Sequence, residues 1–393
     1  MSYFYEKENF SMETRKLYYE DCHMASFRAR VLSCEQTDKG CEVILGATAF
    51  YPEGGGQAAD TGMLGNVRVL DTHEKNGQVV HYCEGPLPVG AEVPGQIDYA
   101  ARFYRMQQHT GEHIVSGILF RRYGCHNVGF HMGSEVITID LDHVVPVEDL
   151  PDIEREANEA VWENLPVSCT VPSPEELEKI AYRSKRALPW PVRIVEVPGF
   201  DTCACCGTHV SHTGEIGVIK LISAIPFRSG TRMEMACGKQ AMDLLNGCFD
   251  QNRLVSQAFS AKILETGEAA HRMNDQVEKL KYRIVGLERR IFDGIALKYT
   301  GLGDVVHFEE GLDNVAVREL ADRIADSCGG LAAVFSGSDE TGYAFCLVTR
   351  EGDLRKLCKD MTGTLNGRGG GKPQFQQGRV NAHQEDIAAF FKK

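Results

Sequence analysis

The 393-residue sequence contains no uninterrupted apolar run of the ~18 residues that a membrane span requires, so we expect no membrane partner. Its first residues lack a basic stretch followed by an apolar core and are not expected to form a signal peptide. Basic residues are in deficit, since 42 Lys and Arg face 55 Asp and Glu and leave a formal net charge of −13. This charge disfavours indiscriminate nucleic-acid binding but is compatible with a local basic surface.

Cysteine is abundant, but its fourteen residues do not show the spacing of a small disulfide-stabilised domain. This usage favours reduced thiols, and we expect a cytoplasmic protein. The length of the chain predicts two or three domains rather than one core.

Four successive segments are predicted, with an α+β fold class overall. Residues 1–100 contain short alternating runs separated by turn residues, which predict a small β-barrel; Lys75-Asn-Gly-Gln78 is typical of a type I′ hairpin. Residues 101–238 mix helical and strand patterns and predict an α+β domain. Residues 239–298 are helical and charged, and residues 299–393 return to an α/β pattern.

The helical segment carries six apolar residues at alternating spacings of four and three: Met273, Val277, Leu280, Ile284, Leu287 and Ile291. This is the a/d seam of a coiled coil. One amphipathic helix packed on its own domain would show the same pattern. A sustained 3.5-residue repeat fits a partner helix better, so we expect a homodimer formed through residues 239–298.

Two histidine motifs, set far apart, offer a set of metal ligands. In His109-Thr-Gly-Glu-His113 the two histidines share one face of a predicted helix. In Cys205-Cys-Gly-Thr-His209 the glycine disfavours a helix, which predicts a loop or strand end. Three imidazoles and one thiol suit Zn²⁺, and we expect one ion per chain. Cys203 and Cys206 are alternative sulfur ligands, but only Cys205 lies four residues before His209.

The first motif also matches the His-x-x-Glu-His pattern of a class of metallopeptidases, in which the glutamate is the general base. A peptidase is therefore an alternative function. Glu112 neighbours His113 directly, so we expect its side chain to point off the metal-facing side of the helix. The peptidase hypothesis also leaves Cys205 and His209 without a role.

A third motif runs from Thr48 to Gly62 and contains the consecutive glycines Gly54, Gly55 and Gly56. Glycines within a β-rich region allow a ligand to approach the backbone closely, or allow a turn at positive φ. Thr48 and Gln57 add neutral donors and acceptors beside them. A hairpin turn with a bulge would explain the glycines as well, but the length and polarity of the segment favour a substrate-facing role.

Two clusters of basic residues are candidates for a local nucleic-acid surface. The first consists of Arg183, Lys185, Arg186 and Arg193. The second includes Arg368 and Lys372 in a glycine-rich segment, residues 366–373, which we expect to be a loop. Pro373 follows Lys372, so the segment is no Walker A motif, but its amides and basic side chains could hold a phosphate.

Taken together, these motifs resemble a known family, the editing domain of alanyl-tRNA synthetase and the free-standing AlaX deacylases. The motifs that carry the resemblance are Phe50-Tyr-Pro-Glu-Gly-Gly-Gly-Gln57-Ala-Ala-Asp60-Thr-Gly62, His109-x-x-x-His113, Cys205-Cys-Gly-Thr-His209, Gly230-Thr-Arg-Met-Glu234 and Ala236-Cys-Gly238. The helical segment with Gly367-Arg-Gly-Gly-Gly-Lys372 resembles the C-terminal domain of the synthetase, so the chain is similar to the long form of AlaX.

The resemblance implies a zinc-containing editing domain with ligands at His109, His113, Cys205 and His209. It implies hydrolysis of the ester that joins serine, or glycine, to alanine tRNA, with a misacylated tRNA as the partner. It also implies that Thr48 and Gln57 face the aminoacyl group, within a substrate-facing segment that includes Gly54 to Gly56 and Asp60, and that Arg368 and Lys372 contact tRNA.

Four protein ligands normally close a zinc site, whereas catalysis requires an open position. We therefore expect one weak ligand or a five-coordinate ion. A zinc-stabilised module that only binds tRNA is the non-enzymatic alternative.

Overall fold

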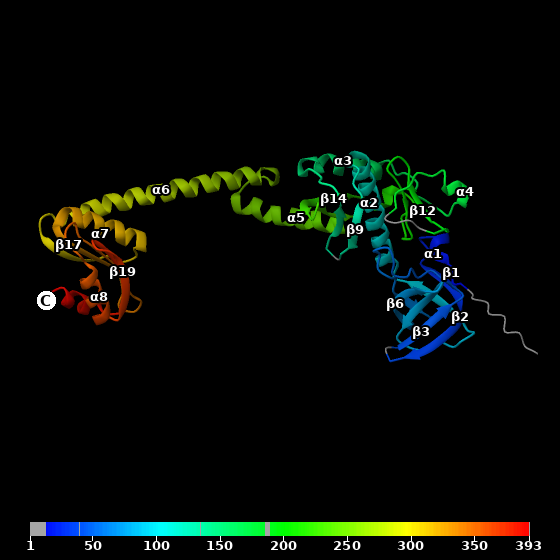
Figure 1. Ribbon diagram of the computed structural model, residues 1–393, viewed down its shortest axis with the longest axis horizontal. Helices are drawn as coiled ribbons and strands as arrows, with labels where there is room; N and C mark the ends of the chain where they lie inside the picture. Colours follow the sequence, from blue (N-terminus) through cyan, green and yellow to red (C-terminus); the bar gives the residue numbers. More distant parts are fainter. Residues whose placement is uncertain (1–12, 39, 134, 185–188, 393) are drawn as a thin grey trace, which may run out of the picture. The chain divides into compact units, whose positions relative to one another are not determined.

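The computed structural model describes residues 13–38, 40–133, 135–184 and 189–392. The chain divides into two compact units, Met1–Arg253 and Leu254–Lys393 (Figure 1). The sequence predicts four segments, whereas the structure divides into two units, so the division into four stays a prediction. In the described part of the chain, no helix is long and apolar enough to cross a membrane.

The first unit opens with a closed barrel of six strands. Its order is β2 (Ser26–Thr37), β3 (Gly40–Leu45), β7 (Gln78–Cys83), β6 (Val67–Lys75), β5 (Gly62–Leu64) and β8 (Glu92–Ile97). Alternate side chains such as Val43, Leu45 and Val69 are fully buried inside it. Beside it lie the short parallel strands β1 (Arg15–Lys16) and β4 (Ala47–Thr48), with the one-turn helix α1 (Leu17–Glu20).

The turn between β6 and β7 is the predicted hairpin. Lys75 pairs with Gln78, and the intervening Asn76 and Gly77 have φ values of 52° and 78°. Positive φ at both central residues is the type I′ geometry. This prediction is confirmed.

A long helix, α2 (Tyr99–Tyr123), follows the barrel and carries the first histidine motif. Asp98 caps its N-terminus by accepting from the Ala101 N–H, and Gly124 ends it at φ 68°. Its middle is buried, and Gly111 and Gly117 allow the close packing. A Cβ on Gly111 would lie 2.3 Å from Cys237 Sγ, and one on Gly117 would lie 2.2 Å from the Phe200 carbonyl oxygen.

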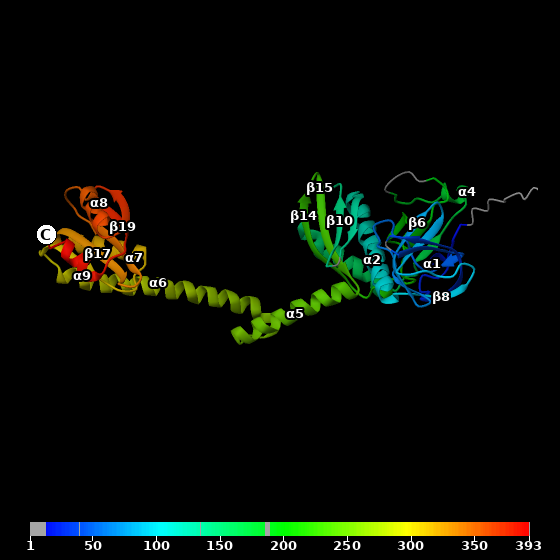
Figure 2. The same cartoon turned by 90° about the horizontal axis from the view of Figure 1, so that it is seen from below.

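Helix α2 packs with α3 (Leu150–Trp162) on a four-stranded antiparallel sheet, and Figure 2 shows this sheet beside α2. The strand order is β14 (Ile219–Phe227), β15 (Gly230–Cys237), β10 (Ile137–Leu141) and β9 (Asn127–Met132). A smaller sheet pairs β11 (Ser168–Thr170), β12 (Ile194–Val197) and β13 (Asp201–Ala204). The short helix α4 (Pro174–Leu177) precedes β12, and α5 (Lys239–Phe259) follows the four-stranded sheet.

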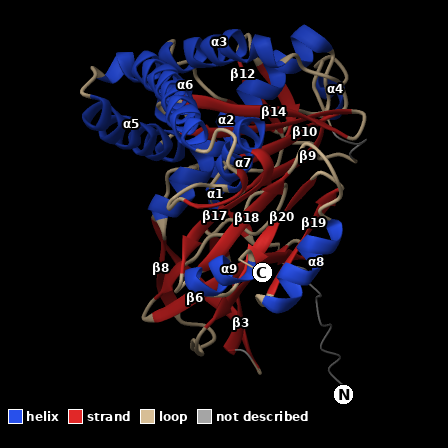
Figure 3. Cartoon of the chain, turned by 90° about the vertical axis from the view of Figure 1, so that its left-hand side faces the viewer, coloured by secondary structure: helices blue, strands red, loops and turns tan. Residues whose placement is uncertain are grey.

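The second unit contains α6 (Thr266–Lys298) and a five-stranded sheet with the helices α7 (Asn314–Cys328), α8 (Arg355–Thr364) and α9 (Gln384–Phe390). Figure 3 separates these helices from the strands by colour. The strand order is β16 (Gly303–Phe308), β17 (Gly329–Ser338), β18 (Gly342–Val348), β20 (Phe375–Val380) and β19 (Gly367–Lys372).

Strand β19 corrects one expectation. The glycine-rich segment predicted as a phosphate-holding loop is an edge strand, paired antiparallel with β20 from Gly367 to Lys372. Close contact explains the glycines, because a Cβ on Gly369 would lie 2.6 Å from Cζ of Phe345. Amides on the paired side of this strand bond to β20 and are not available to a ligand.

The predicted seam residues of α6 are exposed. Only the C-terminal part of this helix joins the core of its unit, through Phe292, Ile295 and Ala296. The six seam side chains, from Met273 to Ile291, keep between 39% and 58% of their surface accessible. They therefore do not form the packed face that the single-helix alternative requires within this unit.

Candidate metal centre

Four side chains converge beside α2 and are called the metal centre below: His109, His113, Cys205 and His209. The first two lie one turn apart on α2, and the other two lie in the loop that follows β13. Their potential ligand atoms all lie within 4.8 Å of one another. The loop position of the second pair agrees with the sequence prediction.

Each histidine of the metal centre is oriented through its Nδ1 atom. His109 Nδ1 lies 3.1 Å from Gln57 Oε1, and His113 Nδ1 lies 2.9 Å from Asp201 Oδ2. Because these oxygens only accept, both Nδ1 atoms donate, and Nε2 is left as the ligand atom. This is the arrangement by which proteins fix metal-ligating histidines.

The third histidine has an orphaned ligand atom. His209 Nδ1 lies 3.2 Å from Thr110 Oγ1, whereas its Nε2 is buried with no hydrogen-bond partner. His109 Nε2 lies 3.4 Å from Cys205 Sγ. A buried nitrogen without a partner is costly, and a metal ion between these atoms would satisfy it.

The pKa values of Cys205 and His209 are shifted towards their metal-ligating forms. Burial would raise the pKa of the Cys205 thiol, but the imidazoles of His109 and His113 outweigh it and hold the pKa well below its ordinary value. Burial, assisted by His109, lowers the pKa of His209 to about 3, so its ring is neutral. A thiolate and a neutral imidazole are what a transition-metal ion requires.

The other two cysteines near the metal centre differ from Cys205. Burial raises the pKa of Cys203 to about 11, so its thiol is protonated near neutral pH. Cys203 belongs to a second cluster with His113 and Asp201, but Asp201 is already bonded to a guanidinium. Cys206 is exposed. The geometry thus favours Cys205 as the sulfur ligand.

The loop of the metal centre is held by Arg193. Its Nη1 donates to the carbonyl oxygens of Cys205 and Gly207, each at 2.9 Å. Its guanidinium lies 4.6 Å from the ring centre of Tyr19, whose hydroxyl donates to the carbonyl of Cys206.

Gly207 allows this loop to approach α2. A Cβ at this position would lie 2.1 Å from His109 Cε1 and 3.1 Å from Gln57 Oε1. The glycine of the second motif is therefore required by a close approach.

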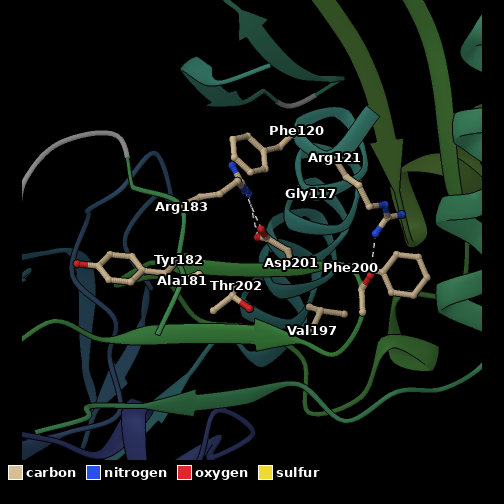
Figure 4. A pocket seen from close by; sticks show the side chains of 11 residues that line it. Gly117, Phe120, Arg121, Ala181, Tyr182, Arg183, Val197, Phe200, Asp201 and Thr202 are labelled. Atoms are coloured by element: carbon tan, nitrogen blue, oxygen red, sulfur yellow. Dashed lines mark hydrogen bonds and ion pairs between the residues drawn. The ribbon is translucent and has the colours of Figure 1, made fainter. Parts of the chain in front are cut away.

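Asp201 connects His113 to a basic residue. Arg183 Nε donates to Asp201 Oδ1 at 2.7 Å and Arg183 Nη2 donates to Oδ2 at 2.9 Å, as Figure 4 shows. Burial opposes ionisation of Asp201, but His113 and Arg183 prevail and lower its pKa. This contact changes the interpretation of the first basic cluster, which was a candidate nucleic-acid surface. Arg183 and Arg193 form hydrogen bonds that position the metal centre, while Lys185 and Arg186 lie outside the described residues.

A cavity of about 710 Å³ opens beside the metal centre. Three members of the metal centre line it, His109, His113 and Cys205, together with Glu112 and Asn127. Glu112 thus lines the same cavity, although it belongs to neither cluster of potential metal ligands among the described residues. Asn127 belongs to none of the motifs in the sequence and was not predicted as a site residue.

The glycine-rich motif forms a tight turn at the edge of this cavity. The amides of Gly54 and Gln57 exchange bonds with each other's carbonyls, at 3.1 and 2.9 Å, and Gly55 and Gly56 have φ values of 62° and 86°. Gly55 lines the cavity, and a Cβ on Gly56 would lie 2.8 Å from the ring of Phe130.

Both ends of the Gln57 side-chain amide form hydrogen bonds within the protein. Its Nε2 donates to Thr208 Oγ1 at 2.8 Å, and its Oε1 accepts from the Thr208 N–H and from His109. It therefore positions a ligand of the metal centre, while its expected role in facing the aminoacyl group stays a prediction.

Two other expected site residues are not brought to the cavity. Thr48 is fully buried, and its Oγ1 lies 2.8 Å from His81 Nε2. Asp60 is fully buried too and accepts from the Tyr51 N–H and from Arg102. Both side chains form hydrogen bonds inside the fold, and their expected contact with substrate stays a prediction.

A helix-borne histidine pair and a loop-borne cysteine and histidine, three of which line one cavity, define the site as a candidate metal centre. Three family models match the sequence. They are "Threonyl and Alanyl tRNA synthetase second additional domain" at residues 192–234, "tRNA synthetases class II (A)" at residues 3–101 and "DHHA1 domain" at residues 299–393.

Named relatives extend this similarity over most of the chain. An alanyl-tRNA editing protein, Aarsd1-B of Xenopus laevis, is 29% identical over 92% of this chain and 89% of its own length. The alanyl-tRNA editing protein AlaX-L of Pyrococcus horikoshii is 27% identical over 95% and 96%. An alanine–tRNA ligase of Thermofilum pendens is 32% identical over 94% of this chain, which spans only 42% of the ligase. The resemblance to the AlaX family is confirmed.

Proposed function

We propose that the protein is a trans-editing deacylase that hydrolyses the ester joining serine, and glycine as a second substrate, to alanine tRNA. The observation that carries the proposal is the convergence of His109, His113, Cys205 and His209 beside a cavity. The similarity to alanyl-tRNA editing proteins supports it. A metallopeptidase would leave Cys205 and His209 without a role.

The metal centre would hold one Zn²⁺ per chain, since three imidazole nitrogens and a thiolate are zinc ligands. When bound, the ion would polarise the ester carbonyl and acidify a water molecule. Gln57, Asp201 and Thr110 keep the imidazoles oriented. All fourteen cysteines are free, in accord with the reducing cytoplasm that we propose as its location.

Strands β19 and β20 supply the tRNA-contacting residues in this proposal. Arg368 lies directly opposite Arg379 in the ladder, and Lys372 lies on the same face of β19 as Arg368 because side chains two residues apart share a face. Arg368 and Lys372 are exposed. Like charges directly opposite each other are destabilising, and a phosphate group would relieve them.

We also propose that the chain forms a homodimer through residues 239–298. The six seam residues are exposed along α6. Apolar burial contributes about 25 cal/mol per Å². A partner helix that covers this seam would remove the six apolar side chains from water and so stabilise the dimer.

The test is incubation with seryl-, glycyl- and alanyl-tRNA(Ala), with and without a chelator. We expect release of serine, slower release of glycine and sparing of the alanyl ester. Chelation should abolish release while tRNA binding persists. Binding without hydrolysis of any ester would instead establish the non-catalytic module.

Cys205→Ala and Cys248→Ala form a matched pair for the same assay, because Cys248 is an exposed cysteine on α5. Loss of activity should be confined to Cys205→Ala. Full activity in that variant would remove Cys205 from the site.

A further inference from the structure

Glu112 is the one carboxylate among the described residues that line the cavity beside the metal centre. It is only 5% exposed. It does not belong to either cluster of potential metal ligands found among the described residues. Burying a carboxylate is costly unless it is paired, so this residue requires an explanation.

The hydrogen bonds of Glu112 are both made by one oxygen. Oε1 accepts from Asn127 Nδ2 at 2.6 Å and from the Ser116 hydroxyl. These donors are neutral, and in the described part of the chain no cation forms an ion pair with Glu112. The cation that shares the cavity wall, Arg183, is already engaged by Asp201 through two nitrogens.

Asn127 adds a second acceptor to the same wall. Its amide nitrogen is used by Glu112, whereas its Oδ1 is buried and has no hydrogen-bond partner. Asn127 is 6% exposed and lines the cavity. A buried acceptor without a donor, beside a carboxylate with no ion-pair partner, is complementary to a group that is cationic and carries several N–H donors.

We propose that Glu112 and Asn127 bind the α-ammonium group of the aminoacyl ester. An ammonium has three donors and no acceptor, so it can bond both side chains at once. Glu112 and the potential metal ligand His113 line the same cavity. A substrate whose ester carbonyl lies beside His113 could therefore place its α-ammonium, one carbon away, beside Glu112. This inference rests on the proposed deacylase function and names the part of the substrate that the cavity recognises.

The proposal has a consequence for selectivity. Esters whose amine is acylated carry no charge on that nitrogen and leave Glu112 unpaired in the cavity. Removal of one partner of a buried charge is penalised strongly. The enzyme should therefore act on free aminoacyl esters and spare N-acylated ones.

The test compares two esters on the same tRNA: seryl-tRNA(Ala) and its deaminated analogue, in which a hydroxyl replaces the α-ammonium. Wild type should prefer the seryl ester by about 10- to 100-fold in kcat/KM, the range of a hydrogen bond to a charged group. Glu112→Gln should lose that preference by slowing only the seryl ester. Glu148→Gln, at an exposed site, is the matched control and should behave as wild type.

Asn127→Ala is a second variant, and it should also slow only the seryl ester, with a smaller decrease in kcat/KM than Glu112→Gln. Bound zinc is measured in every variant, since a loss of metal would slow both esters. An equal loss on both esters with zinc retained would overturn the proposal and assign Glu112 to the reacting ester. Unchanged preference in Glu112→Gln would overturn it too. If wild type hydrolyses neither ester, the deacylase function itself fails.

Discussion

Substitution of Gly207 by alanine should disable the metal centre without a change in any ligand. The added Cβ would lie 2.1 Å from His109 Cε1, and ordinary contact begins at 3.4 Å, so the ring or the loop must move by about 1.3 Å (3.4 − 2.1). Metal–ligand distances tolerate about ±0.2 Å. Loss of an orienting partner alone weakens metal binding about 10- to 100-fold, so we expect a loss of about 100-fold or more for a displaced ligand.

The assay is zinc affinity by competition with a chromophoric chelator, with deacylation of seryl-tRNA(Ala) measured in parallel. Gly85→Ala is the matched control, because a Cβ on Gly85 would meet nothing within 4 Å. Circular dichroism and unfolding midpoints should show that both variants fold. Wild-type zinc affinity in a folded Gly207→Ala protein would refute the close approach of this loop to His109.

Three further predictions concern other parts of the chain. Burial lowers the pKa of His81 to about 4 from 6.5. As the pH falls, the unfolded chain therefore binds this proton before the folded chain does, so the stability that His81 contributes is present above pH 6.5 and is lost towards pH 4. Denaturant titration should give an unfolding free energy about 2–3 kcal/mol lower at pH 4.5 than at pH 7. Leu280→Glu with Ile284→Glu should convert a dimer to a monomer in sedimentation experiments, and an unchanged mass would contradict the seam. Arg368→Ala and Lys372→Ala should each reduce the slope of log K against log salt for tRNA binding by about 0.7–0.9, and an unchanged slope would exclude the residue from phosphate contact.

The elements that the sequence predicted well depend on local signals. The Asn76-Gly77 turn needs positive φ at two adjacent residues, a requirement that few other dipeptides meet, and it is found as expected. Strand β19 gave the wrong signal, because glycines have no side chains to alternate and are typical of loops. Only its pairing with β20, which the sequence does not encode locally, makes it a strand.

The candidate site shows the same contrast between features set by local sequence and features set by distant contacts. Helical spacing was enough to bring His109 and His113 to one face. Their orienting partners are 52 and 88 residues away in sequence, Gln57 and Asp201, and no periodicity relates them. Thr48 was expected at the substrate because a hydroxyl beside bare backbone suggests recognition. In the structure its hydroxyl bonds to the buried His81 of the barrel, a contact that the sequence does not encode locally.

The position of the metal centre on the cavity wall bears on how four protein ligands can be compatible with catalysis. His109, His113 and Cys205 line the cavity, whereas His209 does not and presents its ligand atom from the buried side. The proposed Zn²⁺ would be held by His109, His113 and Cys205 from the cavity wall and by His209 from the buried side, and it would polarise the ester carbonyl. Zinc sites can expand to five ligands during catalysis, so four protein ligands are compatible with the proposed reaction. On this proposal no weak fourth ligand is required, because the neighbouring imidazoles hold the pKa of the Cys205 thiol well below its ordinary value.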